Sequence, residues 1–131
     1  MIRVTFGDMG GALWLDMYGH ANSAEYGRDL ICAAATALTY TAAQLAMDLD
    51  ADYGLEASPT VELIPGKATV RIQPVNMEVA RAQWGVIRRG MEMLAGNYPK
   101  NIKIYYIGNG ESREDKTEDS RAEPADMEPL A

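Results

Sequence analysis

Residues 13–38, LWLDMYGHANSAEYGRDLICAAATAL, contain the change of hydrophobic period that decides the fold. At the start of this stretch, Leu13, Leu15 and Met17 alternate with polar or aromatic residues, which predicts a strand with one buried face. From about Asp29 onward, apolar residues recur every three or four positions, which predicts a long helix with one buried stripe. A loop of small residues joins the two, so the chain passes here from a sheet to a helix that covers it.

Two hairpins, a second helix and a last strand are predicted around this stretch. Residues 2–6 alternate in the same way and form a hairpin with residues 13–18, and residues 61–72 form a second hairpin with a tight turn at 64–67. The second helix follows Asn76 and ends before Pro99, which cannot continue a helix. The last strand is expected at 102–107. The first helix is expected to bury Ile31, Ala35, Leu38, Ala42, Leu45 and Leu49. The second helix is expected to bury Val79, Ala82, Val86, Gly90 and Met93.

The resulting order, ββαββαβ, predicts an α+β two-layer sandwich in which two helices cover one face of a mostly antiparallel sheet. We expect this single domain to occupy residues 1–108. Residues 109–131 carry eight acidic and three basic residues and few apolar ones. Such a segment cannot bury enough surface to offset the entropy of ordering it, so we expect an acidic, disordered tail.

Composition excludes several classes of function. A chain of 131 residues with net charge −7 is one domain without the clustered positive charge that nucleic acid or an anionic membrane attracts. One cysteine and one histidine can form neither an internal disulfide nor a zinc quartet, and we expect no metal and no cofactor. We see no signal peptide and no apolar run near the roughly 20 residues of a membrane-spanning helix, which favours a cytoplasmic protein.

The only histidine, His20, and the only cysteine, Cys32, stand at the two ends of the loop. If Asp29 caps the helix, Cys32 falls in the first turn, where unpaired N–H groups and the helix dipole favour a thiolate. On the helical wheel Cys32 lies about 100° from the expected stripe, beside Asp29 and Thr36. Gly19, without a side chain, would leave room for a substrate backbone. From spacing alone, two interpretations stay open: a catalytic dyad, or an inert buried thiol beside a solvated histidine.

The residues Gly19-His20, Gly27, Asp29 and Cys32-Ala33-Ala34 follow one another in the order and spacing of a known family pattern. That pattern is Gly-His, a short loop, Gly-x-Asp, then Cys and two small residues, and it resembles the ribosomal-processing cysteine protease family, Prp. The ββαββαβ order over residues 1–108 is also similar to that family's fold. One departure is Thr36, because the family commonly has Ser four residues after the cysteine.

This resemblance implies a function and roles for the site residues. Cys32 would be the nucleophile, His20 the general base, and Asp29 would help to order the site. The family acts as homodimers and removes a short N-terminal extension from large-subunit ribosomal protein twenty-seven. The alternative is a non-enzymatic dimeric module that binds a ribosomal or assembly partner, and a redox-sensing cysteine is a third hypothesis. Trp84 lies about 140° from the expected stripe of its helix. We expect it either to mark a partner surface, such as that of a homodimer, or to rest on a neighbouring loop.

Overall fold

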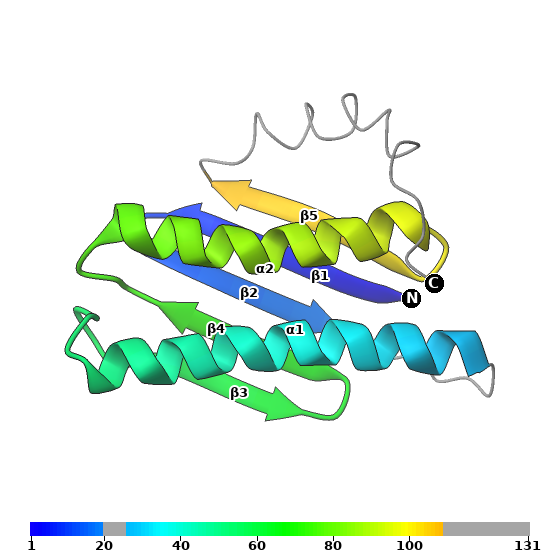
Figure 1. Ribbon diagram of the computed structural model, residues 1–131, viewed down its shortest axis with the longest axis horizontal. Helices are drawn as coiled ribbons and strands as arrows, with labels where there is room; N and C mark the ends of the chain where they lie inside the picture. Colours follow the sequence, from blue (N-terminus) through cyan, green and yellow to red (C-terminus); the bar gives the residue numbers. More distant parts are fainter. Residues whose placement is uncertain (20–25, 109–131) are drawn as a thin grey trace.

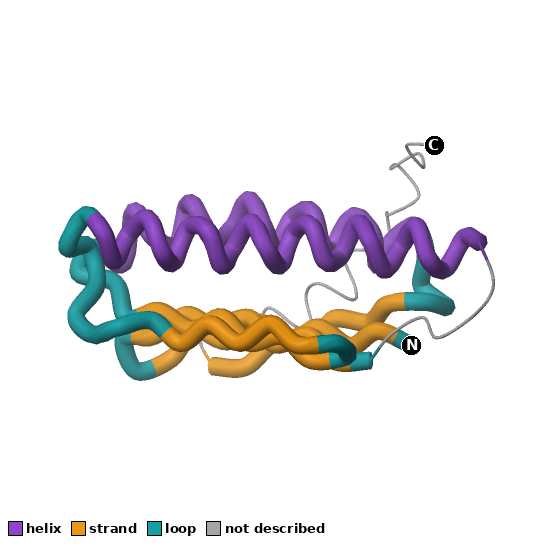
Figure 2. The backbone as a smooth tube through the Cα atoms, turned by 90° about the horizontal axis from the view of Figure 1, so that it is seen from below, coloured by secondary structure: helices purple, strands orange, loops and turns teal. Residues whose placement is uncertain are grey.

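Both helices lie on one face of a single sheet (Figures 1 and 2). The computed structural model describes residues 1–19 and 26–108, with only the backbone for 26–29. The order ββαββαβ and the α+β two-layer architecture are confirmed. The elements are β1 (Ile2–Met9), β2 (Ala12–Tyr18), α1 (Tyr26–Ala51), β3 (Thr60–Ile64), β4 (Lys67–Ile72), α2 (Met77–Asn97) and β5 (Ile102–Gly108).

The sheet has the strand order β3-β4-β2-β1-β5. Every neighbouring pair is antiparallel except β1 and β5, which are parallel, so the sheet is mostly antiparallel as predicted. Arg3 pairs with Tyr18, which pairs with Lys67, and this row marks the end of the sheet at which β1 begins. The first hairpin turns at Gly10 and Gly11, whose φ values of 64° and 81° suit glycine.

The face of α1 that is buried differs from the predicted stripe. Ile31, Ala35 and Ala42 are buried as expected, but the three leucines of the stripe are only partly buried. Thr39, Ala43 and Ala46 are buried instead. The small residues let α1 approach the sheet closely, while Leu38 turns sideways toward α2. The buried face is therefore rotated toward Cys32.

The predicted buried stripe of α2 is wrong, because the buried face of the helix is displaced from it by about one residue. Val79 and Val86 are 50% and 65% exposed. Two apolar series run along this helix side by side, and the one with the larger side chains faces the sheet because it removes more apolar area from water. Trp84 belongs to that series and is 5% exposed, so the partner surface predicted there is also wrong. The buried residues of α2 are Ala80, Trp84, Gly85, Ile87, Met91 and Leu94.

One helix has the length and composition of a membrane span, contrary to the expectation from the sequence. The segment of α1 that meets these criteria is Leu30–Ala51, with a mean hydropathy of 1.4. The core helix of a folded domain meets the same criteria, and here Ala35, Ala42 and Ala46 are buried in the domain's own core. This segment is therefore weak support for a membrane-spanning role.

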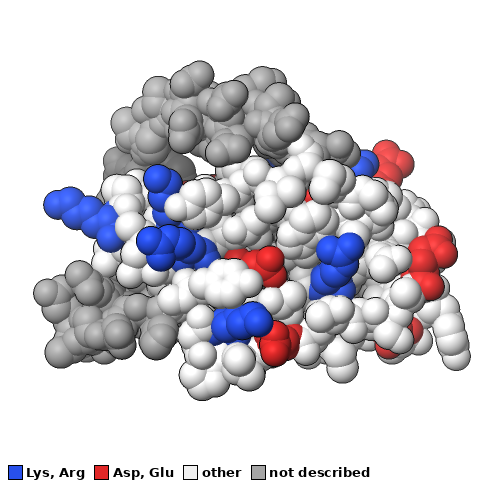
Figure 3. Space-filling view, turned by 180° about the vertical axis from the view of Figure 1, so that it is seen from behind, with Lys and Arg blue, Asp and Glu red and all other residues white. Residues whose placement is uncertain are grey.

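Among the described residues, no helix or strand covers the face of the sheet away from α1 and α2 (Figure 2). In the part of this face that the structure describes, basic side chains are interspersed with acidic and uncharged ones (Figure 3). Lys67 there pairs with Glu62 at 3.4 Å, and Arg71 lies over the ring of Trp14 at 4.9 Å.

Candidate active site

Helix α1 begins three residues earlier than predicted, at Tyr26. Gly27 does not stop the helix, because a single interior glycine costs only about 1 kcal/mol relative to alanine, which a helix of 26 residues absorbs. Asp29 thus stands within the helix, and the prediction that it is the N-cap is wrong. Cys32 lies in the second turn, beyond the unpaired N–H groups of the first.

The rotation of α1 is set by two contacts on different sides. Leu38 faces α2, where a Cβ on Gly90 would come within 2.9 Å of the Leu38 Cδ2 atom. Thr39 faces the sheet, with its Oγ1 3.6 Å from the Met17 sulfur of β2 and donating to the Ala35 carbonyl at 2.9 Å.

These contacts locate Cys32 on the helical wheel. At about 100° per residue, Cys32 lies about 20° beyond Thr39 on the side away from Leu38, and Thr36 lies about 60° beyond it. Cys32 is a free thiol of intermediate exposure that packs against the core. The predicted separation of Cys32 from the buried face is therefore wrong. Cys32 and Thr36 do share one margin of α1, turned away from α2, which we call the thiol margin.

Cys32 also lies level with the end of β2 along the helix axis. The start of α1 and the end of β2 point to the same side of the molecule (Figure 1). From the Thr39–Met17 contact, Cys32 is about 10 Å toward the helix start. Gly19 is about 7 Å from Met17 in the same direction. Cys32 is therefore level, along the helix axis, with the place where β2 ends and residue 20 follows; His20 itself lies outside the described residues.

Gly19 is held between two other parts of the sheet. Its N–H donates to the Gly66 carbonyl at 3.0 Å, and its φ is +94°. A Cβ at this position would lie 2.4 Å from the Met1 carbonyl oxygen. The direction in which we expected room for a substrate backbone is thus occupied by Met1. The glycine is required by the chain's own packing, and its contacts fix the position of the residue that directly precedes His20 in the sequence.

The structure thus brings together part of the predicted site. Cys32 and Thr36 share the thiol margin of α1, and Gly19, which directly follows β2, is at the level of Cys32 along the helix axis. The side chain of Asp29 lies outside the described side chains, and Gly27 is described only as backbone within α1.

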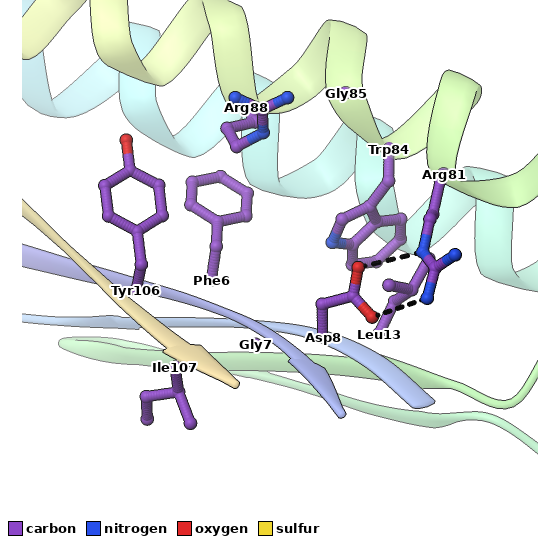
Figure 4. A pocket seen from close by; sticks show the side chains of 10 residues that line it. All are labelled: Phe6, Gly7, Asp8, Leu13, Arg81, Trp84, Gly85, Arg88, Tyr106 and Ile107. Atoms are coloured by element: carbon purple, nitrogen blue, oxygen red, sulfur yellow. Dashed lines mark hydrogen bonds and ion pairs between the residues drawn. The ribbon is translucent and has the colours of Figure 1, made fainter. Parts of the chain in front are cut away.

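A separate cavity of about 110 Å³ lies under α2, at the opposite end of the sheet from Gly19 (Figure 4). Arg81 donates through Nε and Nη2 to the Asp8 carboxylate at 2.9 and 3.1 Å, and this hydrogen bond raises the pKa of Arg81. Among the described residues, the Trp84 Nε1–H is a buried donor without a partner. Sequence reasoning missed this cavity, because Trp84 was expected on the surface. No lining residue is a cysteine or histidine, so it offers no nucleophile for peptide hydrolysis. The lining residues are Phe6, Gly7, Asp8, Leu13, Arg81, Trp84, Gly85, Arg88, Tyr106 and Ile107.

Comparison with known proteins adds a family and three similar solved structures. The family model described as cysteine protease Prp matches residues 1–103. SMU.848 from Streptococcus mutans is 24% identical, with 83% of this chain and 96% of that chain covered and a TM-score of 0.60. The essential ribosomal processing protease Prp from S. aureus, in complex with a covalently linked product peptide, is 23% identical over 81% of this chain and 99% of that chain, with a TM-score of 0.63.

The same S. aureus protease in complex with a substrate peptide is 22% identical, with coverage of 81% and 99% and a TM-score of 0.58. At these identities the solved structures show the fold alone. No curated protein matches the chain. The family match includes the whole segment from Gly19 to Thr36.

Proposed function

This chain belongs to the cysteine protease Prp family, and from that premise we propose that it cleaves its substrate with a Cys32–His20 dyad. The protein is a cysteine protease of the ribosomal-processing type. The observation that carries the dyad is the level of Cys32: along the helix axis it matches the end of β2, which directly precedes Gly19 and His20 in the sequence. No other cysteine or histidine exists in the chain.

The chemistry follows from these two groups. His20 takes the thiol proton, and the Cys32 sulfur attacks the peptide carbonyl carbon. The C–N bond then breaks, and His20 gives its proton to the leaving amine. Water, deprotonated by His20, hydrolyses the thioester and releases the N-terminal fragment as a carboxylic acid. No cofactor or metal takes part in this proposal.

Four further residues support the dyad in this proposal. Gly19 fixes the start of the segment that carries His20, because its N–H is bound to Gly66 and its α-carbon is packed on Met1. Thr36 keeps a hydroxyl one turn after Cys32 on the thiol margin. Gly27 and Asp29 lie in the first turn of α1, and we assign to Asp29 the ordering of the site rather than the capping of the helix.

We further propose that the substrate is the short N-terminal extension of large-subunit ribosomal protein twenty-seven. The solved S. aureus protease is described as a ribosomal processing enzyme with substrate and product peptides, which supports a peptide substrate here. The proposal includes a homodimer in the cytoplasm, where ribosomal proteins are made, with no direct contact to nucleic acid or membrane. It also treats residues 1–108 as the protease domain and 109–131 as a separate acidic tail.

A second candidate function is favoured by the packing of the thiol. Cys32 is partly buried against the core, which is typical of an inert structural cysteine. In that case the chain would bind a ribosomal partner without cleaving it. Hydrolysis of a peptide separates the two functions.

The test is cleavage of a synthetic peptide spanning the extension and its first mature residues. We expect the wild-type chain to cut it at one bond and Cys32→Ala to lose at least about a thousandfold in rate, since the covalent step is removed. Mass spectrometry of the products identifies the bond. Binding of the peptide to the wild-type chain without cleavage would favour the binding module instead.

A further inference from the structure

We propose that the substrate peptide binds in an extended conformation as an additional strand along the free edge of β3. This inference rests on the proposed function and adds the surface that holds the peptide. Edge strands present backbone groups with which an extended peptide can pair, and this is a common way to hold a peptide backbone.

The first observation is the position of β3 in the sheet. Among the residues that the structure describes, β3 has one neighbouring strand, β4, and its other edge is free. The hairpin closes through a two-residue turn on the pair Ile64–Lys67. Because antiparallel pairs alternate, the backbone groups of Glu62 and Thr60 also point toward β4. Those of Val61 and Leu63 therefore point to the free edge.

The second observation is that the thiol margin of α1 is on the same side of the molecule. Leu38 faces α2, and Thr36 is about 160° around the helix from Leu38. The flank opposite α2 lies toward β3, as Figure 1 shows. The other edge strand, β5, lies beneath α2, at the edge of the sheet that is farther from this margin. A peptide on β3 thus lies next to the margin that carries Cys32, whereas a peptide on β5 does not.

The third observation indicates which end of β3 would lie beside the peptide bond that is cut. The Gly19–Gly66 hydrogen bond ties the end of β2 to the β3–β4 turn. Cys32 is level with that end of the sheet, so the bond to be cut lies next to Ile64. The rest of the peptide then runs along β3 toward Thr60.

The side chains of β3 agree with this placement. Leu63 and Val61 pair with Ala68 and Val70, so they point to the helix side of the sheet. Leu63 is nevertheless 37% exposed, because α1 does not cover the edge. Alternate side chains of the bound peptide would lie beside Leu63 and Thr36. The surface therefore favours apolar residues at every second position of the substrate.

The first test separates the Leu63 N–H group from its side chain. Leu63→Pro removes an N–H that points to the free edge and leaves the pairing with β4 intact. Leu63→Ala is the matched control, because it shortens the side chain and keeps the N–H. We expect kcat/KM for the extension peptide to be about tenfold lower for Leu63→Pro than for Leu63→Ala, mainly through KM. Alkylation of Cys32 by iodoacetamide, which is too small to use the edge, should be equal in both variants.

The second test uses the unmodified protein and a substrate methylated at one backbone nitrogen at a time. Pairing with a strand involves every second residue of the peptide. We expect the loss of kcat/KM to alternate along the peptide with a period of two residues. This measurement decides the matter if Leu63→Pro lowers the thermal stability too far to be compared.

The outcomes are distinct. A tenfold difference between the two variants, or an alternating methylation pattern, supports strand addition on β3. Equal kcat/KM for Leu63→Pro and Leu63→Ala, with a pattern that does not alternate, overturns it while leaving the protease function in place. A wild-type chain that does not cleave the peptide overturns the proposed function and this inference together.

Discussion

Gly19 is a residue at which backbone conformation and packing both demand glycine. Its φ is +94°, and a Cβ would strike the Met1 carbonyl oxygen at 2.4 Å. We expect Gly19→Ala to lower the free energy of unfolding by about 3 kcal/mol or more, since left-handed strain costs about 1–2 kcal/mol and the clash adds to it. Urea denaturation followed by circular dichroism measures the change.

Gly10→Ala is the matched control for Gly19→Ala. Gly10 also has a positive φ, +64°, but nothing lies within 4 Å of the position that a Cβ would take there. It should show the backbone strain alone, about 1–2 kcal/mol. Equal losses for the two variants would contradict a role for the Met1 contact in holding the end of β2.

At the scale of single elements, α2 offers a direct check of which face is buried. Trp84 is 5% exposed and Val86 is 65% exposed, although the two are only two positions apart. We expect Trp84→Ala to cost about 3–5 kcal/mol, because it leaves a large cavity between α2 and the sheet. Val86→Ala should stay within about 0.5 kcal/mol. Chemical denaturation of both variants tests this, and a comparable loss for Val86→Ala would mean that the helix is turned the other way.

Local periodicity predicted which elements exist but not how the helices are turned. The alternation in β1, β2 and β4 and the helical spacing in α1 and α2 are properties of neighbouring residues, so the order of elements followed from them. In α2 two apolar series compete, and only the size of Trp84 and Met91 favours the observed one. In α1 the face depends on Leu38 meeting Gly90 of the other helix. That contact joins residues far apart in the sequence.

At the scale of the whole molecule, the candidate site was predicted as a set of residues but not as an arrangement. The residues of the site could be identified because the motif from Gly19 to Thr36 resembles that of the family. The reason for Gly19 lies in Met1 and Gly66, at the starts of two other strands. The level of Cys32 with the end of β2 depends on how α1 packs on the sheet. The free edge of β3 depends on the strand order, and neither can be read from a local pattern.

Because Cys32 lies on α1 and His20 is twelve positions earlier in the sequence, their coupling should exist only in the folded molecule. We expect the rate of Cys32 alkylation by iodoacetamide, measured against pH, to follow a different curve in native wild-type protein and in native His20→Ala. The reason is that a neighbouring imidazole changes how readily the thiol gives up its proton. In denaturant the two proteins should give the same curve, since α1 no longer lies over the end of β2.

Thr36→Ala is the control for this comparison. This substitution changes the thiol margin of α1 but keeps the base, His20. We expect the native alkylation curves of Thr36→Ala and of the double variant Thr36→Ala/His20→Ala to differ from each other as much as the curves of wild-type protein and His20→Ala do. Identical native curves for wild-type protein and His20→Ala would mean that the free molecule does not couple the two groups. The dyad would then have to be assembled by the bound peptide, and the rate of peptide cleavage by His20→Ala would become the deciding measurement.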